Sequence, residues 1–156
     1  MRLQLICVGT QCPRWINEGF TTYWQRLALP FKAELIEINT AKRSKAKSLE
    51  TIKQQEADTI LAAIPKRSHL VVLDERGQSW NTQQLAVHMQ TWLESGNPTT
   101  LVIGGPDGLA SNVLAHAKQV WSMSNLTFPH PLVRVMVAEQ LYRAQSILAN
   151  HPYHRS

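Results

Sequence analysis

The chain has 156 residues, 44% of them hydrophobic and 17% charged, and its 16 Lys and Arg against 11 Asp and Glu give a formal charge of +5. This length fits one domain that buries roughly two thirds of its unfolded surface, and this apolar content excludes a disordered chain. No apolar run approaches the roughly 20 residues that cross a bilayer, so we expect a cytoplasmic protein without a membrane span.

Short apolar runs alternate along the chain with segments that we predict to be helices. The runs predicted as strands are residues 3–8, 33–38, 69–73, 100–103 and 119–123. The predicted helices are residues 13–27, 48–64, 82–94, 111–116 and 131–148. We expect the third strand to end at the turn-like sequence Asp74-Glu75-Arg76-Gly77. This alternation predicts a three-layer α/β fold, with a mostly parallel sheet that helices cover on both faces.

Ligands of such sheets bind beyond the carboxyl ends of the strands, which here are the loops after Leu73, Ile103 and about Trp121. The second of these loops is Gly104-Gly105-Pro106-Asp107-Gly108. Its glycines allow a ligand to approach the backbone closely. The loop lacks the patterns of a Walker loop or a dinucleotide fingerprint, and a purely structural turn explains it equally well.

The third loop covers residues 122–131, in which Pro129 and Pro131 bracket His130 just before the last long helix. Two prolines favour a rigid loop and a defined helix start. Such a loop can wrap an adenine with backbone hydrogen bonds and the side chains of Leu126 and Phe128. A plain strand-to-helix connection is the alternative.

The C-terminal helix and tail carry a second group of candidates. Glu139 and Arg143 are four residues apart, as in an ordinary helix-surface ion pair, and the apolar positions of this helix suit burial against another subunit. The tail that follows, Asn-His-Pro-Tyr-His-Arg-Ser, can stack on bases, exchange protons and hold phosphate. His151 and His154 have no third ligand at metal spacing, so we expect no metal.

Four cations fall within six residues with no acid between them: Lys42, Arg43, Lys45 and Lys47. A positive surface of this kind attracts phosphate, although a solvated basic loop has the same composition. Cys7 and Cys12 are predicted to be free thiols, since two cysteines complete neither a disulfide framework nor a zinc site.

The glycine loop, the stretch Phe-Pro-His-Pro-Leu-Val-Arg-Val from residue 128 and the ending Asn-His-Pro-Tyr-His-Arg together resemble one family. This is the large-subunit ribosomal RNA pseudouridine-N3 methyltransferases, RlmH type, of the SPOUT superfamily, and the resemblance extends over essentially the whole chain. It implies a C-terminal trefoil knot in the α/β fold, a homodimer and S-adenosylmethionine as methyl donor. The implied substrate is N3 of a pseudouridine in 23S rRNA of the assembled ribosome.

The resemblance also implies roles for individual residues. The cofactor residues would be Leu73, Gly104, Met123, Ser124, Asn125, Leu126, Thr127 and Phe128, which lie in the loops that the sheet argument selects. His154 is our candidate proton acceptor, and Arg143 our candidate for steadying the substrate's oxygens. The other candidates for substrate binding are His130, Arg134, Glu139, Tyr153 and Arg155. The tail is also a candidate for completing the active site of a partner subunit.

Two other functions fit the same sequence. A related knotted methyltransferase can act on tRNA at a ribose hydroxyl, and a non-catalytic factor can bind the ribosome through the basic surface alone. The tail sequence favours the ribosomal enzyme over the first, and the complete set of cofactor loops argues against the second.

Overall fold

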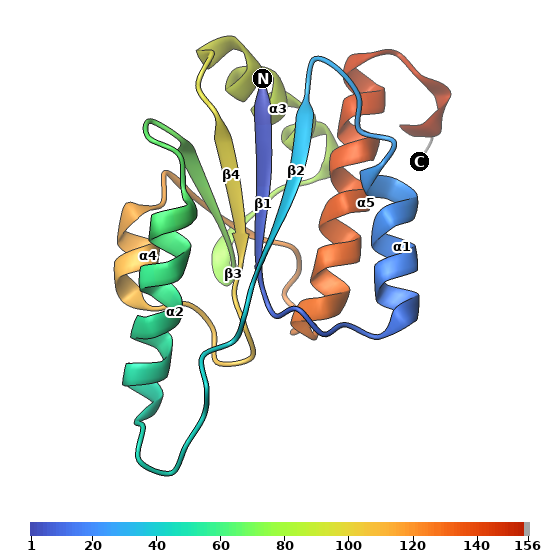
Figure 1. Ribbon diagram of the computed structural model, residues 1–156. Coiled ribbons are helices and arrows are strands. Elements are labelled where there is room, and N and C mark those ends of the chain that lie inside the picture. The colour runs from blue at the N-terminus through green and yellow to red at the C-terminus, as the bar shows by residue number, and fades with distance from the viewer. Residues whose placement is uncertain (155–156) are drawn as a thin grey trace.

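The structure, a computed structural model, describes residues 1–154 (Figure 1). Its strands are β1 (Arg2–Val8), β2 (Lys32–Ile38), β3 (His69–Ser79), β4 (Thr99–Ile103) and β5 (Gln119–Ser122). Its helices are α1 (Arg14–Trp24), α2 (Leu49–Ala63), α3 (Thr82–Ser95), α4 (Ser111–His116), α5 (His130–Leu148) and the short 3₁₀ helix η1 (Pro152–His154). No helix within this part of the chain is long and apolar enough to cross a bilayer.

The five strands form one sheet in the order β2-β1-β4-β3-β5, and every neighbouring pair is parallel. Helices α1, α3 and α5 cover one face and α2 and α4 cover the other (Figure 1). Strand β1 shows why both faces need a cover, since Leu5 and Cys7 pack into one core and Ile6 and Val8 into the other. The predicted three-layer α/β fold is therefore confirmed, while the knot stays a prediction.

Polar side chains fix where two of the helices begin. Asn81 and Gln84 form a reciprocal capping box at the start of α3, and Gly96 ends that helix in a left-handed conformation. The hydroxyl of Ser48 accepts a hydrogen bond from the backbone N–H of Thr51 and caps α2 as predicted. Helix α1 ends at Trp24, three residues before the apolar pattern does.

The sequence predicted that the third strand ends at Leu73, but the strand continues beyond this residue. Leu73 and Gln78 both pair with Trp121, so residues 74–77 leave the ladder as a bulge and β3 continues to Ser79. The predicted turn chemistry is present inside the strand, because the Asp74 carboxylate accepts the backbone N–H of Arg76 at 2.9 Å. Gly77 brings the strand back against β5, where a Cβ would lie 2.5 Å from the carbonyl oxygen of Val120.

We predict that Gly77→Ala lowers the free energy of unfolding by about 2 kcal/mol, because the added methyl group overlaps a backbone carbonyl that cannot move without breaking the β3–β5 pairing. Urea unfolding followed by circular dichroism measures this. Gly19→Ala in α1 is the matched control, since its Cβ would lie 3.5 Å from the Val135 side chain. Alanine favours the helix, so the control should be unchanged or up to about 1 kcal/mol more stable. Equal stability of the two variants would contradict the close approach at Gly77.

Candidate functional site

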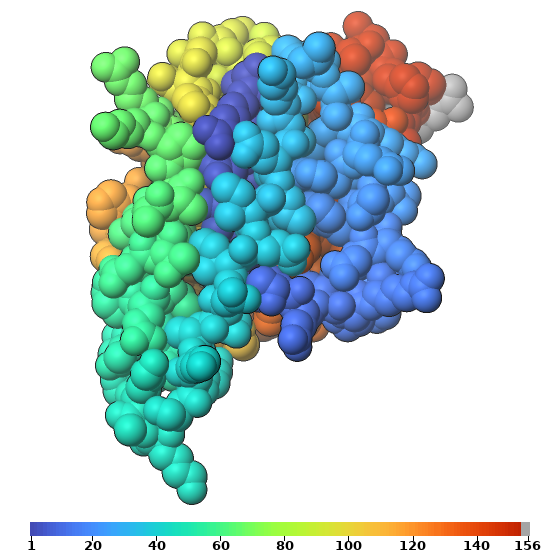
Figure 2. Space-filling model, viewed as in Figure 1, coloured from blue at the N-terminus to red at the C-terminus, as the bar shows by residue number. Residues whose placement is uncertain are grey.

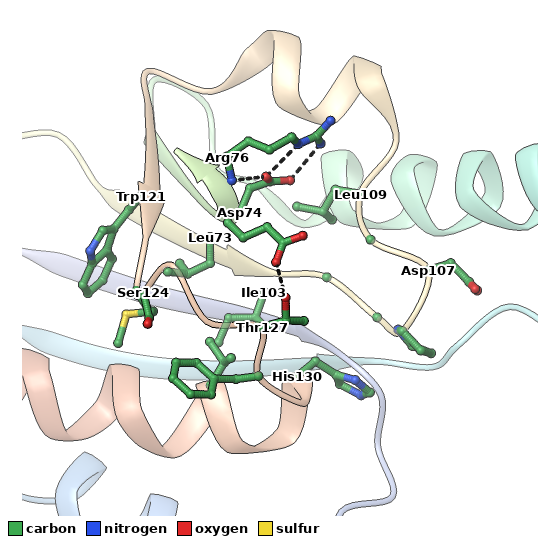
Figure 3. Close-up of a pocket in the computed structure, with 18 of the residues that line it drawn as sticks. Leu73, Asp74, Arg76, Ile103, Asp107, Leu109, Trp121, Ser124, Thr127 and His130 are labelled. Carbon is green, nitrogen blue, oxygen red and sulfur yellow. Dashed lines mark hydrogen bonds and ion pairs between the residues drawn. The ribbon is translucent and has the colours of Figure 1, made fainter. Parts of the chain in front are cut away.

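A cavity of about 510 Å³ lies at the carboxyl ends of β3, β4 and β5 (Figure 3). Three loops and the start of α5 form its walls. The lining residues are Leu73, Asp74, Glu75 and Arg76 at the bulge of β3; Ile103 through Leu109 at and after the end of β4; Trp121, Met123, Ser124, Leu126, Thr127 and Phe128 in β5 and the loop that follows it; and His130 and Val133. The cavity therefore lies where the sheet topology predicted a ligand site.

All residues predicted to bind cofactor line this cavity except Asn125. Their role in binding stays a prediction, but the structure brings them together from three separate loops. Sequence reasoning missed the charged wall formed by Asp74, Glu75 and Arg76, because it read these residues only as a turn. Their position directly after an apolar strand was the signal that pointed to the site.

The glycine loop needs its small residues to keep the cavity open. A Cβ at Gly104 would lie 2.8 Å from Cγ of Leu109, so any side chain there displaces a residue of the cavity wall. Gly108 has φ +78°, a conformation that favours glycine. It also pairs with Gly105 in an isolated antiparallel bridge, which folds the loop back on itself.

The loop after β5 is tied to itself and to the bulge of β3. The Ser122 hydroxyl donates to the carbonyl of Ser124 at 2.9 Å, and the Ser124 hydroxyl accepts the N–H of Leu126 at 2.9 Å. The Thr127 hydroxyl donates to the Glu75 carboxylate at 2.7 Å across the cavity wall (Figure 3). These bonds join the walls contributed by β3 and β5.

Acidic groups outnumber basic groups in the lining. Asp74, Glu75 and Asp107 contribute carboxylates, while Arg76 is the one guanidinium in the wall of this cavity as the structure describes it. Arg76 donates to Asp74 at 2.9 and 3.0 Å and holds the pKa of that carboxyl below its usual range. Burial, with a smaller effect of nearby Arg134, lowers the pKa of His130, which favours the neutral imidazole. Arg43 likewise pairs with Asp107, so Glu75 is the carboxylate of the described wall that no guanidinium neutralises, and it favours a ligand that carries positive charge.

Arg134 lies in the core, outside the wall of the cavity. Its side chain is 2% exposed, and it donates to the Glu37 carboxylate at 2.8 Å and to the carbonyl of Gly9 at 3.0 Å. These bonds tie α5 to the ends of β2 and β1, 97 and 125 residues away in sequence. The predicted contact of Arg134 with substrate stays a prediction, and the structure adds an evident structural role.

The predicted residues of the helix and tail form a second group around Glu139. Its carboxylate accepts from Arg143 at 2.6 Å and from the Tyr153 hydroxyl at 3.2 Å. The Arg143 guanidinium also lies 4.9 Å from the centre of the Tyr153 ring. The Glu139 carboxylate raises the pKa of Arg143, while burial and then Glu139 raise the pKa of Tyr153.

This Glu139 group lies apart from the cavity. Thirteen residues separate Arg143 from His130, which is about 20 Å along a helix. Glu139 lines a second cavity of about 500 Å³, which shares Trp121 and Met123 with the first. Arg155 and the side chain of His154 lie outside the described residues. Among residues 1–154, no three His, Cys, Asp or Glu side chains are placed to hold a metal ion.

A parallel α/β sheet with a ligand cavity over its carboxyl edge, walled by a glycine loop, defines a class of proteins that bind nucleotide-like molecules. The chain belongs to the SPOUT methyltransferase family, because a family model described as a predicted SPOUT methyltransferase matches residues 1–154. Enzymes of this family use S-adenosylmethionine, which confirms the predicted cofactor.

Several solved structures align with most of this chain. The SpoU methyltransferase AviRb from Streptomyces viridochromogenes, solved in complex with AdoMet, is 12% identical with a TM-score of 0.47 over 91% of this chain and 57% of that one. A second AviRb structure is 11% identical with a TM-score of 0.49 over 96% of this chain and 61% of that one. A structure described as giving insights into the 2-OH methylation of C/U34 on tRNA is 16% identical, with a TM-score of 0.49 over 96% and 98% of the two chains. The chain therefore spans about three fifths of the AviRb chains.

We predict that Arg134→Met lowers the free energy of unfolding by about 2–3 kcal/mol, at the low end for a broken buried ion pair because Glu37 keeps access to water. Arg14→Met is the matched control, since it breaks the exposed Arg14–Glu18 pair and should change stability by less than about 0.5 kcal/mol. Urea unfolding followed by tryptophan fluorescence distinguishes them. Unchanged stability in Arg134→Met would contradict the structural role.

Proposed function

We propose that this protein transfers the methyl group of S-adenosylmethionine to N3 of a pseudouridine in 23S rRNA of the assembled ribosome, as a cytoplasmic homodimer. The observation that carries the proposal is the cavity over β3, β4 and β5, whose walls are the three loops that the resemblance assigns to the cofactor. The tail sequence and the Glu139 group support the choice of a pseudouridine base over a ribose.

The cavity fits S-adenosylmethionine in size and in charge. About 510 Å³ lies within the range of roughly 300–1,000 Å³ for small-molecule sites. Leu73, Leu109 and Phe128 offer apolar surface to an adenosine, and Glu75, which forms no ion pair within residues 1–154, offers negative charge to the amino and sulfonium groups. When bound, this cofactor supplies a methyl group made electrophilic by the positively charged sulfur.

The chain's own residues must then orient the base and accept the proton of N3. His154 is the proposed proton acceptor, since an imidazole exchanges protons near neutral pH. Arg143, which stays cationic beside Glu139, is the proposed group that stabilises the negative charge developing on the ring and its oxygens. Tyr153 offers a ring for stacking on the base, and Arg155 a charge for phosphate.

A second copy of the chain explains why these groups lie so far from the cavity. Arg143 and the tail belong to the far end of α5, about 20 Å from the cavity end of the same helix. In a two-fold dimer, the tail of one subunit can reach the cavity of its partner. We therefore propose that each active site combines a cofactor cavity from one copy with the Glu139 group and tail from the other.

We predict that labelled methyl from S-adenosylmethionine appears in pseudouridine of 23S rRNA, and chiefly when assembled ribosomes are offered. The substrates to compare are ribosomes, isolated large subunits, free rRNA and bulk tRNA, all from cells that lack this methyl group. Gly104→Val, whose side chain overlaps Leu109 in the cavity wall, should bind no cofactor and transfer no label.

Label in tRNA would show that the substrate is tRNA and not 23S rRNA, while the proposed methyltransferase activity would stand. Cofactor binding by calorimetry without label in any RNA would favour the non-catalytic ribosome-binding factor. A Gly104→Val variant as active as the wild type would contradict the proposal that this cavity binds the cofactor.

We predict that two inactive variants restore activity when mixed. A chain that ends at Ala149 has a cavity but no tail, and Gly104→Val has a tail but no usable cavity. After unfolding and refolding together at equal amounts, random pairing gives about half mixed dimers, each with one complete site, hence about 25% of wild-type methyl transfer. Each variant refolded alone should stay inactive. No recovery in the mixture, with mixed dimers verified by a tag, would contradict a shared site.

A further inference from the structure

The loop between β2 and α2 protrudes from the body of the molecule. It appears as the teal segment at the bottom of Figures 1 and 2. The loop carries Lys42, Arg43, Lys45 and Lys47, which we call the basic segment, and no acidic residue from Asn39 to Leu49. The cofactor cavity does not account for a concentration of four positive charges here.

Two contacts hold the basic segment beside the cavity. The backbone N–H of Ala41 donates to the carboxylate of Glu56 at 3.1 Å, and Glu56 is buried close to Gly105 of the glycine loop. The guanidinium of Arg43 forms an ion pair with Asp107, which lines the cavity. The first contact joins the loop to α2 next to the glycine loop, and the second joins it to the cavity wall itself, so the segment has a built position at the rim.

The lysines of the segment are open to a polyanion. Lys42 and Lys45 are exposed, and within residues 1–154 neither forms a salt bridge with a carboxylate. Lys47 donates to the neutral amide of Gln55 at 3.3 Å, which leaves its charge uncompensated. Arg43 is thus the member whose charge serves to anchor the segment, while the lysines present theirs to solvent.

We infer that the basic segment binds phosphates of the substrate RNA backbone at the rim of the cofactor cavity and so guides the RNA to the site of methyl transfer. The inference rests on the proposed function, because it names a contact of that same site with its RNA substrate. Flexible lysines act as point charges toward phosphate and need no particular base sequence. The contact should therefore contribute affinity and salt dependence rather than choice of base.

The test compares two double variants that remove the same charge. Lys42→Gln with Lys45→Gln removes the two exposed lysines of the basic segment. Lys66→Gln with Lys118→Gln is the control, because both residues are exposed and lie just before β3 and β5, at the opposite edge of the sheet. Fluorescence anisotropy with a labelled 30-nucleotide single-stranded RNA measures affinity over a range of KCl concentrations, and methyl transfer to ribosomes is measured in parallel.

The Lys42/Lys45 variant should bind the RNA about tenfold more weakly near 100 mM salt, with the slope of log affinity against log salt reduced by about 1.4 for two lost phosphate contacts. Its KM for ribosomes should rise while its affinity for S-adenosylmethionine and its Tm stay unchanged. The control should differ from the wild type by less than about twofold on the same scale.

Equal RNA affinity and salt slope for the two variants would overturn the inference. Binding to vesicles of four parts phosphatidylcholine to one part phosphatidylserine is measured as well. If the Lys42/Lys45 variant lost binding only to these vesicles and not to RNA, the inference would also be overturned, since the segment would then recognise a lipid surface. A wild-type protein that methylates no RNA would overturn the proposed function itself. A wild type that methylates RNA, with both variants alike, would overturn only the role of the basic segment.

Discussion

Parallel pairing of all five strands is the constraint on which the site depends. Because the strands run the same way, the bulge of β3 and the loops that follow β4 and β5 all lie at one edge of the sheet, and the cavity forms between them. The bulge at residues 74–77 adds the charged wall without breaking the sheet, since β3 rejoins β5 at Gln78. The hydrogen bond from Thr127 to Glu75 then locks these two walls together.

Helix α5 connects the two parts of the molecule that carry candidate chemistry. Its first turn supplies His130 to the cavity, and one turn later Arg134 fixes the helix to Glu37 and Gly9. The charge of Arg134 is stabilised in the core because both of its partners are strong acceptors. Glu139 and Arg143 follow on the same rigid element, so their distance from His130 is set by helix geometry.

Local patterns in the sequence predicted what local physics determines. Apolar periodicity located each strand and helix, and strand ends located the three loops of the cavity. The bulge was missed because the turn-forming sequence at Asp74 is the same whether the strand ends there or pairs again with a strand distant in sequence. The burial of Arg134 and the pairing of Arg43 with Asp107 were missed for a related reason. Their partners lie 97 and 64 residues away, and no spacing rule connects them.

The proposed function makes two opposite demands on the charges at this edge of the sheet. A cofactor with a sulfonium group favours the carboxylates inside the cavity, whereas an RNA backbone is attracted by cations and repelled by those same carboxylates. The molecule places the two signs on separate loops, with Glu75 and Asp107 inside and the free lysines of the basic segment outside. The Arg43–Asp107 ion pair lies at the boundary, where it neutralises the carboxylate nearest the segment. Because it also holds that segment in place, one contact lets a single edge attract both a cation and a polyanion.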